Sequence, residues 1–520
     1  MIPERLVAAA PLLELSLADY VDRLNAIWHG QILAVSLTLP FEHRTAAVEP
    51  VREFPKPYRQ GWVDDDWYYE ICALRAFEKH GIGLTVDQLG QQWLENNCGS
   101  YGSSWFALQN LQRGLTGSAS GHPRYNRVWW TIGPVFSSDL YGALAPGLPN
   151  VAGRMAREYG HLNGYAESVD GAVIFAGTIS LAFGERDPRR LLRQAVTLVH
   201  PSSPYRQCVE SVLTAAEAGR SFEEIVAQVE DRWHLEYPAT NNAVANGGIA
   251  AAVLWFGQGD FWRTIDLAAR AADYTDTDNS AATAASVIGA MHGMKALPAK
   301  LVAQLADRIV GAEMGRLKLT PPVDESISGL ARRTAAIGEQ ILLAHGARRT
   351  DDRLQIAVEE PRTQPAERFT LADLMQYWNP DWSLERAGFG GTEIGAMPGI
   401  RGLTFLDGDV LVTFPRDEVR GLVLRRVARL GDAPRLTVEV AAEPRRAWEF
   451  SIYAGNRQIA RRIITGTEEG RTFLPLEFDL AAFAGREVTL RLYQRTLLIN
   501  SPVAPGNACW RNLRLIGAAP

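Results

Sequence analysis

Apolar residues recur at a spacing near 3.6 along the first two thirds of the chain. Windows such as residues 16–28, 67–80, 169–183 and 243–256 are rich in Ala and Leu, and clusters of Gly, Pro and Asn separate them. This period places apolar side chains on one side of a helix, and strand-type alternation is scarce here. The pattern therefore predicts an all-α domain over residues 12–348.

The pattern changes after residue 348. Residues 349–400 are rich in Pro, Gly and charged residues, which predicts a linker with short irregular elements. Residues 401–520 contain short alternating runs separated by turn residues, at 409–414, 421–427, 435–442, 448–455, 457–465, 473–480, 487–495 and 509–517. Runs of this length at regular intervals predict an antiparallel β-sandwich. We therefore expect a multidomain chain, with an all-α domain followed by a β-sandwich.

Composition narrows the possible classes of protein. The chain has 520 residues, 47% of them apolar and 22% charged, with a net charge of −6 and no long Lys/Arg run, so we expect no nucleic-acid partner. Four scattered cysteines fit neither a disulfide framework nor a zinc site and favour a reducing compartment. The N-terminus lacks the pattern of a secretory signal, and no apolar run is long enough for a membrane span. We expect a cytoplasmic protein with no membrane partner.

Three consecutive aspartates, Asp64, Asp65 and Asp66, precede the apolar face of the helix predicted at residues 67–80. Carboxylates are favourable at a helix start because unpaired N–H groups and the helix dipole attract negative charge. One aspartate suffices for a cap, and two more add mutual repulsion. From these residues alone, a cap and a functional site are about equally supported.

A second acidic cluster, Asp276, Asp278 and Asn279, precedes residues 280–291, which contain no charged residue. A helix that is apolar on every side is buried, and carboxylates at its buried start must be paired or hold a metal. No Lys or Arg lies between Arg270 and Lys295, so a local ion pair is not supplied. If the two clusters met in space, their hard oxygen ligands would suit Mg²⁺.

The two acidic motifs resemble those of the ADP-ribosylglycohydrolase family over roughly residues 20–345. Members pair a Thr-Asp-Asp-Thr motif with a Gly-Gly-Asp-Thr-Asp-Thr motif around two Mg²⁺ ions in an all-α fold. The resemblance implies a glycosidase that uses two Mg²⁺ ions, with Mn²⁺ or Ca²⁺ as alternatives, to hydrolyse an N- or O-glycosidic bond at an ADP-ribosyl or related sugar group. The implied metal ligands are Asp64, Asp65, Asp66, Asp276, Asp278 and Asn279, and Asp65 and Asp66 are also implied catalytic residues. In this register Asp64 takes the position of the family threonine; a shift by one residue would place Val63 there.

A third family motif, Gly-Asp-x-x-Gly-x-Pro-x-Glu, is kept only in part in "AVSLTLPFE". Pro40 and Glu42 match, whereas Ala34, Val35 and Thr38 stand where the family has Gly, Asp and Gly. The resemblance makes Glu42 the catalytic carboxylate that positions or activates water. The alternative for a lone glutamate here is an exposed loop residue.

Two further stretches resemble the family, "WWTIGPVFSSDLYGALAPG" and "EYGHLNGYAES". They make Gly133 and His161 predicted substrate-binding residues, although a histidine in a helix-start turn is more often a hydrogen-bonded structural residue. Asn241, Asn242 and Asn246 precede another Ala-rich helix and are either helix caps, which we favour, or ligand amides.

The C-terminal runs are similar to galactose-binding-like jelly-roll modules, which implies a glycan partner, a cover for the helical domain or a dimer contact. Two other functions stay open for the chain. One is a glycoside or nucleoside hydrolase with a substrate other than ADP-ribose, and the other is a non-catalytic ligand-binding relative.

Overall fold

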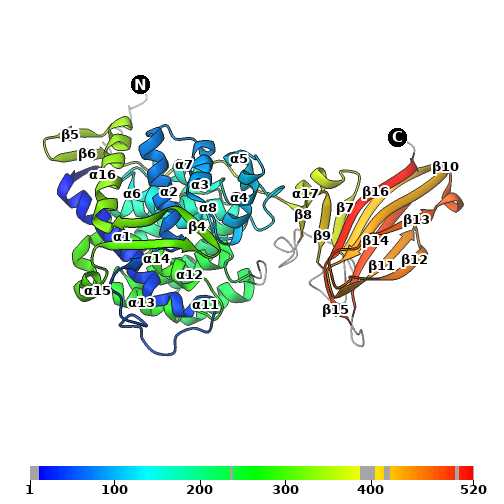
Figure 1. Ribbon diagram of the computed structural model, residues 1–520, viewed down its shortest axis with the longest axis horizontal. Helices are drawn as coiled ribbons and strands as arrows, with labels where there is room; N and C mark the ends of the chain where they lie inside the picture. Colours follow the sequence, from blue (N-terminus) through cyan, green and yellow to red (C-terminus); the bar gives the residue numbers. More distant parts are fainter. Residues whose placement is uncertain are drawn as a thin grey trace, which may run out of the picture. The chain divides into compact units, whose positions relative to one another are not determined.

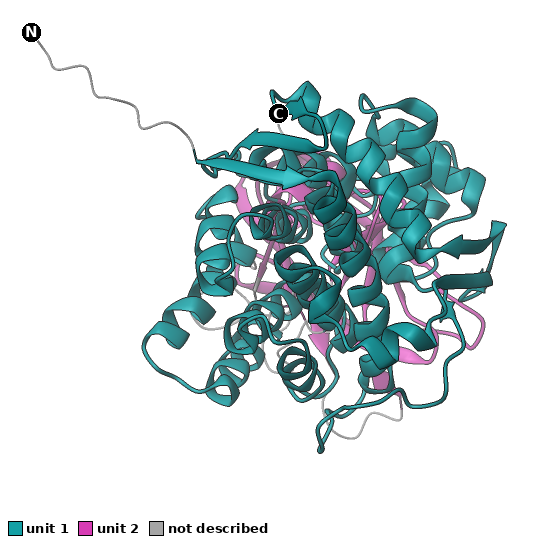
Figure 2. Ribbon diagram, turned by 90° about the vertical axis from the view of Figure 1, so that its left-hand side faces the viewer, with its two compact units in different colours: residues 1–122, 128–234, 239–368 teal, residues 123–127, 235–238, 369–520 magenta. Residues whose placement is uncertain are grey.

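A computed structural model describes residues 11–234, 237, 239–386, 404–414, 422–497 and 503–518 (Figure 1). The chain forms two compact units. Unit 1 comprises residues 1–122, 128–234 and 239–368, and unit 2 comprises residues 123–127, 235–238 and 369–520 (Figure 2). Each unit has its own core and is described by itself.

Unit 1 is built on four long helices, α1 (Leu17–Thr38), α8 (Glu167–Ala182), α12 (Ala243–Gly257) and α14 (Thr277–His292). Every residue of α8 is buried, as is every residue of α14 except His292. Helices that are apolar on all sides must lie inside a domain, as the sequence predicted for α14. Around them lie α2 (Asp65–His80), α3 (Val86–Asn96), α4 (Gly102–Gln112), α5 (Gly117–Ser120), α6 (Ser138–Ala143), α7 (Pro149–Gly160), α9 (Pro188–Ala195), α10 (Pro204–Glu217), α11 (Phe222–Val229), α13 (Phe261–Ala269), α15 (Ala299–Gln304) and α16 (Ile327–Ala344).

Helices α1 and α14 approach each other closely through Gly289. A Cβ atom at Gly289 would lie 2.7 Å from the backbone of Ala26 and Ile27 on α1. This glycine allows the two backbones to meet, and the same contact fixes the helix that carries Asp278 at its start.

We predict that Gly289→Ala destabilises unit 1 by about 1–3 kcal/mol, the usual cost of overpacking a filled core. Urea unfolding followed by circular dichroism measures it. The control is Gly83→Ala, where a Cβ would meet nothing within 4 Å; equal stability of the two variants would contradict the close packing.

Unit 1 also contains two small sheets that the sequence analysis missed. One has the order β1-β6-β5, from β1 (Leu12–Ser16), β6 (Arg353–Ala357) and β5 (Arg348–Thr350), and the other joins β2 (Gly61–Trp62), β3 (Arg308–Met314) and β4 (Leu317–Ser326). Strand β1 pairs with β6 across more than 300 residues of chain, so its partner could not be found from local patterns.

Residues 358–368 continue from β6 and lie along unit 1 without regular secondary structure. The Glu359 amide donates to the Gly147 carbonyl at 2.9 Å, and the Gln364 amide donates to the Leu198 carbonyl at 2.8 Å. Part of the predicted linker is therefore ordered structure of unit 1. Residues 387–400 of that linker lie outside the described residues.

Unit 2 is an antiparallel β-domain with one helix, α17 (Leu371–Trp378). The long strand β10 (Leu422–Ala442) belongs to both of its layers, pairing with β14 (Glu487–Thr496) and β7 (Ser383–Arg386) through its first part and with β13 (Leu474–Asp479) and β16 (Ala508–Ala518) through its second. Strands β11 (Arg446–Ala454) and β12 (Arg457–Thr465) extend the first layer, β9 (Val410–Thr413) and β8 (Phe405–Asp407) extend the second, and β15 (Ala504–Pro505) pairs with β11 in parallel.

The two layers of unit 2 face each other across an aromatic core. Trp448 on β11 and Trp510 on β16 have ring centroids 4.8 Å apart, and Phe450 on β11 stacks on Phe478 of β13 at 5.7 Å. The predicted β-sandwich is confirmed, and two of the predicted runs, at 421–427 and 435–442, turn out to belong to the single strand β10.

Candidate metal centre

The first acidic cluster lies at the start of α2. Asp64 is the N-cap residue, with extended backbone angles, and its side chain accepts a hydrogen bond from the Asp66 amide at 3.3 Å. Asp65 and Asp66 follow in the first helical turn, where the positive end of the helix dipole favours carboxylates. The buried face of α2 that begins at Trp67 anchors this turn in unit 1.

The second acidic cluster lies at the start of α14. Asp276 is the N-cap residue, and its amide donates to the Asn246 side-chain oxygen at 3.0 Å. Asp278 follows in the first turn. Asp276 and Asp278 are 5% and 4% exposed, so both carboxyl groups are withdrawn from bulk water.

The fold brings the two helix starts together, as the sequence predicted. Carboxylate oxygens of Asp64, Asp66 and Asp278 lie within 4.8 Å of one another, although about 210 residues separate the helices in the chain. A second group of donor atoms with the same spacing is formed by Glu42, His43 and Asp276. The two groups share no residue.

Both groups open into one cavity of about 410 Å³. Its lining consists of Leu39, Glu42, His43, Asp64, Asp65, Asp66, Tyr101, Gly102, Ser103, Thr131, Ile132, Gly133, Phe136, Asn241, Asp276 and Asp278. Among these described residues there is no Lys or Arg, and six of the sixteen side chains are carboxylates.

This concentration of carboxylates shifts their protonation. Burial raises the pKa of Asp64 to about 6, and the charge of Glu42 adds to the shift. Burial and mutual repulsion raise the pKa values of the others well above the ordinary range, and this applies to Asp65, Asp66, Asp276 and Asp278. Burial also raises the pKa of Glu42, which Arg44 partly opposes. A bound cation would reverse these shifts because it stabilises the ionised form.

The residues present fit a divalent cation. The Asp278 oxygen Oδ1 is buried and has no hydrogen-bond partner in the part of the chain that the structure describes, which is unfavourable unless a ligand completes it. Hard carboxylate oxygens from two converging helix starts are the donors that Mg²⁺ and Mn²⁺ prefer.

Two of the predicted metal ligands, Asn279 and Asp64, differ in their relation to the cavity. Asn279 donates from its amide nitrogen to the Asp66 oxygen Oδ1 at 2.8 Å, and it is not among the residues that line the cavity. In this arrangement it orients Asp66, and its role as a ligand stays a prediction. Of the alternatives for the family threonine position, Asp64 lines the cavity, whereas the Val63 side chain packs over Gly311.

The predicted substrate-binding residues are placed differently from each other. Gly133 lines the cavity, and a Cβ there would lie 2.4 Å from the Ser103 hydroxyl oxygen. The cavity wall therefore has no room for a side chain at this position. His161 is not among the lining residues. Its Nε2 atom lies 2.8 Å from the Glu367 oxygen Oε1, which makes it part of an ion-pair network of unit 1 and not of the cavity wall.

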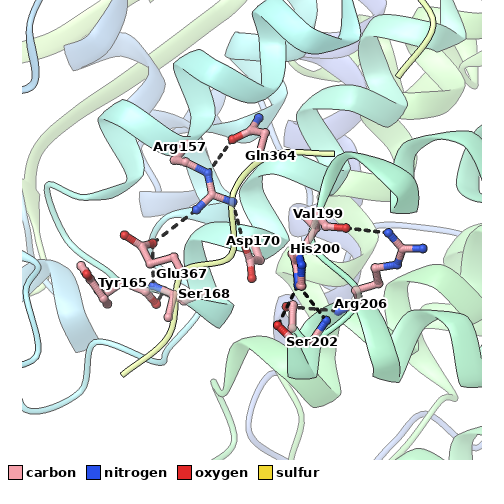
Figure 3. Close-up of polar contacts among 12 residues, drawn as sticks. Arg157, Tyr165, Ser168, Asp170, Val199, His200, Ser202, Arg206, Gln364 and Glu367 are labelled. Carbon is pink, nitrogen blue, oxygen red and sulfur yellow. Dashed lines mark hydrogen bonds and ion pairs between the residues drawn. The ribbon is translucent and has the colours of Figure 1, made fainter. Parts of the chain in front are cut away.

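Figure 3 shows that network around Arg157. The guanidinium donates to Asp170 at 2.7 Å, to Glu367 at 3.4 Å and to the Gln364 side-chain oxygen. Glu367 also accepts from the Ala166 amide at 3.1 Å. The network therefore joins α7, the start of α8 and the 358–368 segment.

Several lining residues were not identified from the sequence. Tyr101 and His43 belong to no recognised motif. Thr131 lies in the stretch "WWTIGPVFSSDLYGALAPG", but the sequence predicted no role for it. All three come from loops or helix ends that only the tertiary fold assembles. Asn242 caps α12 by accepting from the Ala245 amide at 2.7 Å, as favoured, while Asn241 lines the cavity.

A second buried carboxyl pair, Glu70 and Asp139, lies outside the cavity lining. Glu70 accepts from the Leu140 amide at 2.8 Å and from Gln31 Nε2 at 3.0 Å. Burial raises the pKa of Asp139 to about 7, and burial together with the charge of Asp139 raises the pKa of Glu70 well above its ordinary range. Both groups are therefore held protonated more strongly in the folded chain than in the unfolded one.

We predict that Glu70→Gln weakens the pH dependence of stability in the metal-free chain. Carboxyl groups with raised pKa values stabilise the folded chain fully at a pH below their ordinary pKa values of 3.8 and 4.5. This stabilisation is lost as the pH rises through about 7, the pKa of Asp139 in the folded chain. Glutamine removes one of these groups, and the Gln31 oxygen Oε1, which has no partner, can accept from the new amide after a flip. Thermal unfolding at pH 5, 6, 7 and 8 measures the slope; an unchanged slope would contradict the shifted pair.

No helix among the described residues is both long and apolar enough to cross a membrane.

Comparisons with known proteins agree with the class of domain that the fold and the cavity define, a predominantly helical domain with a carboxylate-lined cavity. Residues 16–340, more than half of the chain, match the ADP-ribosylglycohydrolase family. The chain belongs to this family, and the resemblance inferred from its two acidic motifs is confirmed.

Solved structures give weaker likenesses. One described as an ADP-ribosylglycohydrolase-related protein complex is 15% identical, with 62% of this chain and 97% of that chain covered and a TM-score of 0.42. The K3 cleaved adhesin domain of Lys-gingipain from Porphyromonas gingivalis W83 is 10% identical (26% and 91% covered, TM-score 0.18), and a family 29 carbohydrate-binding module is 12% identical (26% and 88% covered, TM-score 0.16). At these values the likenesses carry no argument about function. No curated protein matches the chain.

Proposed function

We propose that this chain is a metal-dependent glycohydrolase that cleaves an N- or O-glycosidic bond at an ADP-ribosyl or related sugar group. The observation that carries the proposal is the meeting of Asp64, Asp66 and Asp278 in a family member's cavity, with a buried carboxylate oxygen left without a partner. We place catalysis in residues 12–348, and a glycan partner for the β-sandwich at 401–520 stays a prediction.

Hydrolysis at a sugar C1 passes through a state with positive charge on the ring, and a water must attack that carbon. Asp64, Asp65, Asp66, Asp276 and Asp278 would hold two divalent cations, Mg²⁺ in the first instance. When bound, such ions fix vicinal sugar hydroxyls and act as Lewis acids.

The chain's own residues supply the remaining requirements. Glu42 lines the same cavity, where burial raises its pKa. A carboxylate positioned beside a water can accept a proton from it. Glu42 would position the attacking water and take its proton. The carboxylates around it would stabilise the positive charge that develops on the sugar ring.

A second substrate class has a specific observation in its favour. Six carboxylates line the cavity, so two divalent cations would leave two negative charges uncompensated if all six were ionised. Residues 34–38, where the family motif has changed, lie in the last turns of α1 and are buried. An uncharged glycoside or nucleoside would meet less electrostatic repulsion in this carboxylate-lined cavity than a substrate with a pyrophosphate group.

The test is product analysis with the full chain on ADP-ribosyl-arginine, ADP-ribosyl-serine, nucleosides and simple glycosides, with Mg²⁺ or with EDTA. We expect Mg²⁺-dependent release of a free sugar product from at least one compound. Glu42→Gln should lower that rate by about 100-fold or more, whereas Glu49→Gln, an exposed change in the same loop, should not. Metal binding without turnover on any compound would instead favour a non-catalytic binding relative.

A further inference from the structure

His43 brings an imidazole to the carboxylate cavity. Its Nε2 atom lies 3.3 Å from the Glu42 oxygen Oε1, and donor atoms of Glu42, His43 and Asp276 all lie within 4.8 Å of one another. We propose that these three residues hold one divalent cation, at a position separate from that of Asp64, Asp66 and Asp278, and that the imidazole gives this position a preference for a first-row transition ion such as Mn²⁺ over Mg²⁺.

The backbone holds His43 beside Asp276. The His43 amide donates to the Thr275 carbonyl at 3.0 Å, and the Tyr274 amide donates to the Arg44 carbonyl at 2.6 Å. These two bonds fasten residues 43–44 to the segment that leads into α14. The φ angle of His43 is +54°, in the left-handed region, which few residues other than glycine adopt and in which histidine, asparagine and aspartate are enriched.

A simple Glu42–His43 pair does not account for the whole arrangement. Asp276 adds a second carboxylate that is 5% exposed, and no Lys or Arg among the described lining residues of the cavity pairs with it. Asp278, two residues further along α14, lines the same cavity and has a buried oxygen without a hydrogen-bond partner among the described residues. One cation at Glu42, His43 and Asp276 would compensate the buried Asp276 carboxylate, and another at Asp64, Asp66 and Asp278 would bind the unpartnered Asp278 oxygen.

The two positions differ in donor chemistry. The group of Asp64, Asp66 and Asp278 offers only hard carboxylate oxygens, which suit Mg²⁺. The group with His43 offers one nitrogen and two oxygens. A nitrogen ligand raises affinity for first-row transition ions relative to Mg²⁺, least for Mn²⁺ and more for Co²⁺ or Zn²⁺. A ligand role for one oxygen of Glu42 leaves its other oxygen available for water. The inference rests on the proposed two-metal centre but not on turnover.

The test is Mn²⁺ binding to the metal-stripped full chain, measured by electron paramagnetic resonance, with pulsed measurements of coupling to ¹⁴N. We expect two bound ions, of which one shows imidazole nitrogen coupling. His43→Asn keeps a residue that tolerates the left-handed backbone but removes the imidazole. The variant should abolish the nitrogen coupling and lower the affinity for one of the two ions by about tenfold or more.

Two further variants separate the outcomes. His200→Ala removes a histidine that pairs with Ser202 and should leave both the coupling and the affinities unchanged. Asp66→Asn should weaken the other ion while the nitrogen coupling persists. Absence of nitrogen coupling in the wild type, or its survival in His43→Asn, would overturn the inference. A chain that binds both ions as expected but hydrolyses none of the compounds above would refute the proposed function and leave this site established.

Discussion

Asp278→Asn is expected to remove Mg²⁺ binding at the oxygen-only position and to stabilise the metal-free chain. The carboxylate is buried, repelled by Asp64 and Glu42, and carries the oxygen without a partner. Asparagine keeps the shape but not the charge, so repulsion falls and the cation loses a ligand. We expect a loss of at least about 100-fold in metal affinity, since even outer partners of metal ligands contribute 10- to 100-fold.

Two measurements on Asp278→Asn check this expectation. Calorimetric titration gives the metal affinity, and thermal unfolding with and without Mg²⁺ gives the stabilisation by the ion. Wild type should gain stability from Mg²⁺ and the variant should gain little, while in EDTA the variant should melt at the higher temperature. Asp273→Asn is the matched control, because Asp273 is exposed in the same loop and its side chain accepts a hydrogen bond from the Ala46 amide, which asparagine can also accept. An EDTA melting temperature below that of the wild type would show that Asp278 is a structural residue and not a repelled ligand.

Arg157→Ala is expected to cost about 3–5 kcal/mol of the free energy of unfolding of unit 1. Arg157 is the ion-pair partner of Asp170, whose side chain is 3% exposed, and loss of one partner leaves an uncompensated buried charge. The substitution also removes the hydrogen bonds from Arg157 to Glu367 and Gln364, which help to hold the 358–368 segment to α7. Urea unfolding followed by the helical circular-dichroism signal measures the cost.

The control for Arg157 is Arg193→Ala, because Arg193 forms a bidentate pair with Glu217 in which the two side chains are 33% and 49% exposed. Exposed pairs contribute about 0–1 kcal/mol. The double variant Arg157→Ala/Asp170→Asn should recover part of the loss, since it removes the unpaired charge. Equal losses for Arg157→Ala and Arg193→Ala would show that burial of Asp170 does not set the energy of the pair.

Helices with strong periodicity were predictable because local sequence determines which side is buried. The predicted windows at 67–80, 169–183 and 243–256 correspond to α2, α8 and α12 within a few residues. The hairpin β3–β4 was missed, although Gly315, with a φ of +57°, marks its turn. Its short alternating strands lie between long helical windows and pair with β2 from a distant part of the chain, so the local signal was weak.

The acidic residues of the candidate site were predictable because carboxylates are unusual at the start of a helix that must be buried. Asp278 stands out because the helix after it carries no charge, and that argument needs no structure. Tyr101 and Thr131 line the cavity from chain segments without periodicity, so their position depends on tertiary contacts that a single sequence does not display. His43 was visible only as a neighbour of Glu42, and its role depends on the backbone bond to Thr275.

The 358–368 segment determines how far the chain can be shortened. The family match ends at residue 340, yet β6 and Glu367, which complete the β1 sheet and the Arg157 network, come later. A fragment cut at residue 340 would lose a strand partner and an ion-pair partner at once, whereas one cut after residue 368 keeps every contact of unit 1 described for that segment. The smallest autonomous piece is therefore larger than the family boundary indicates, and limited proteolysis should release it with this segment attached.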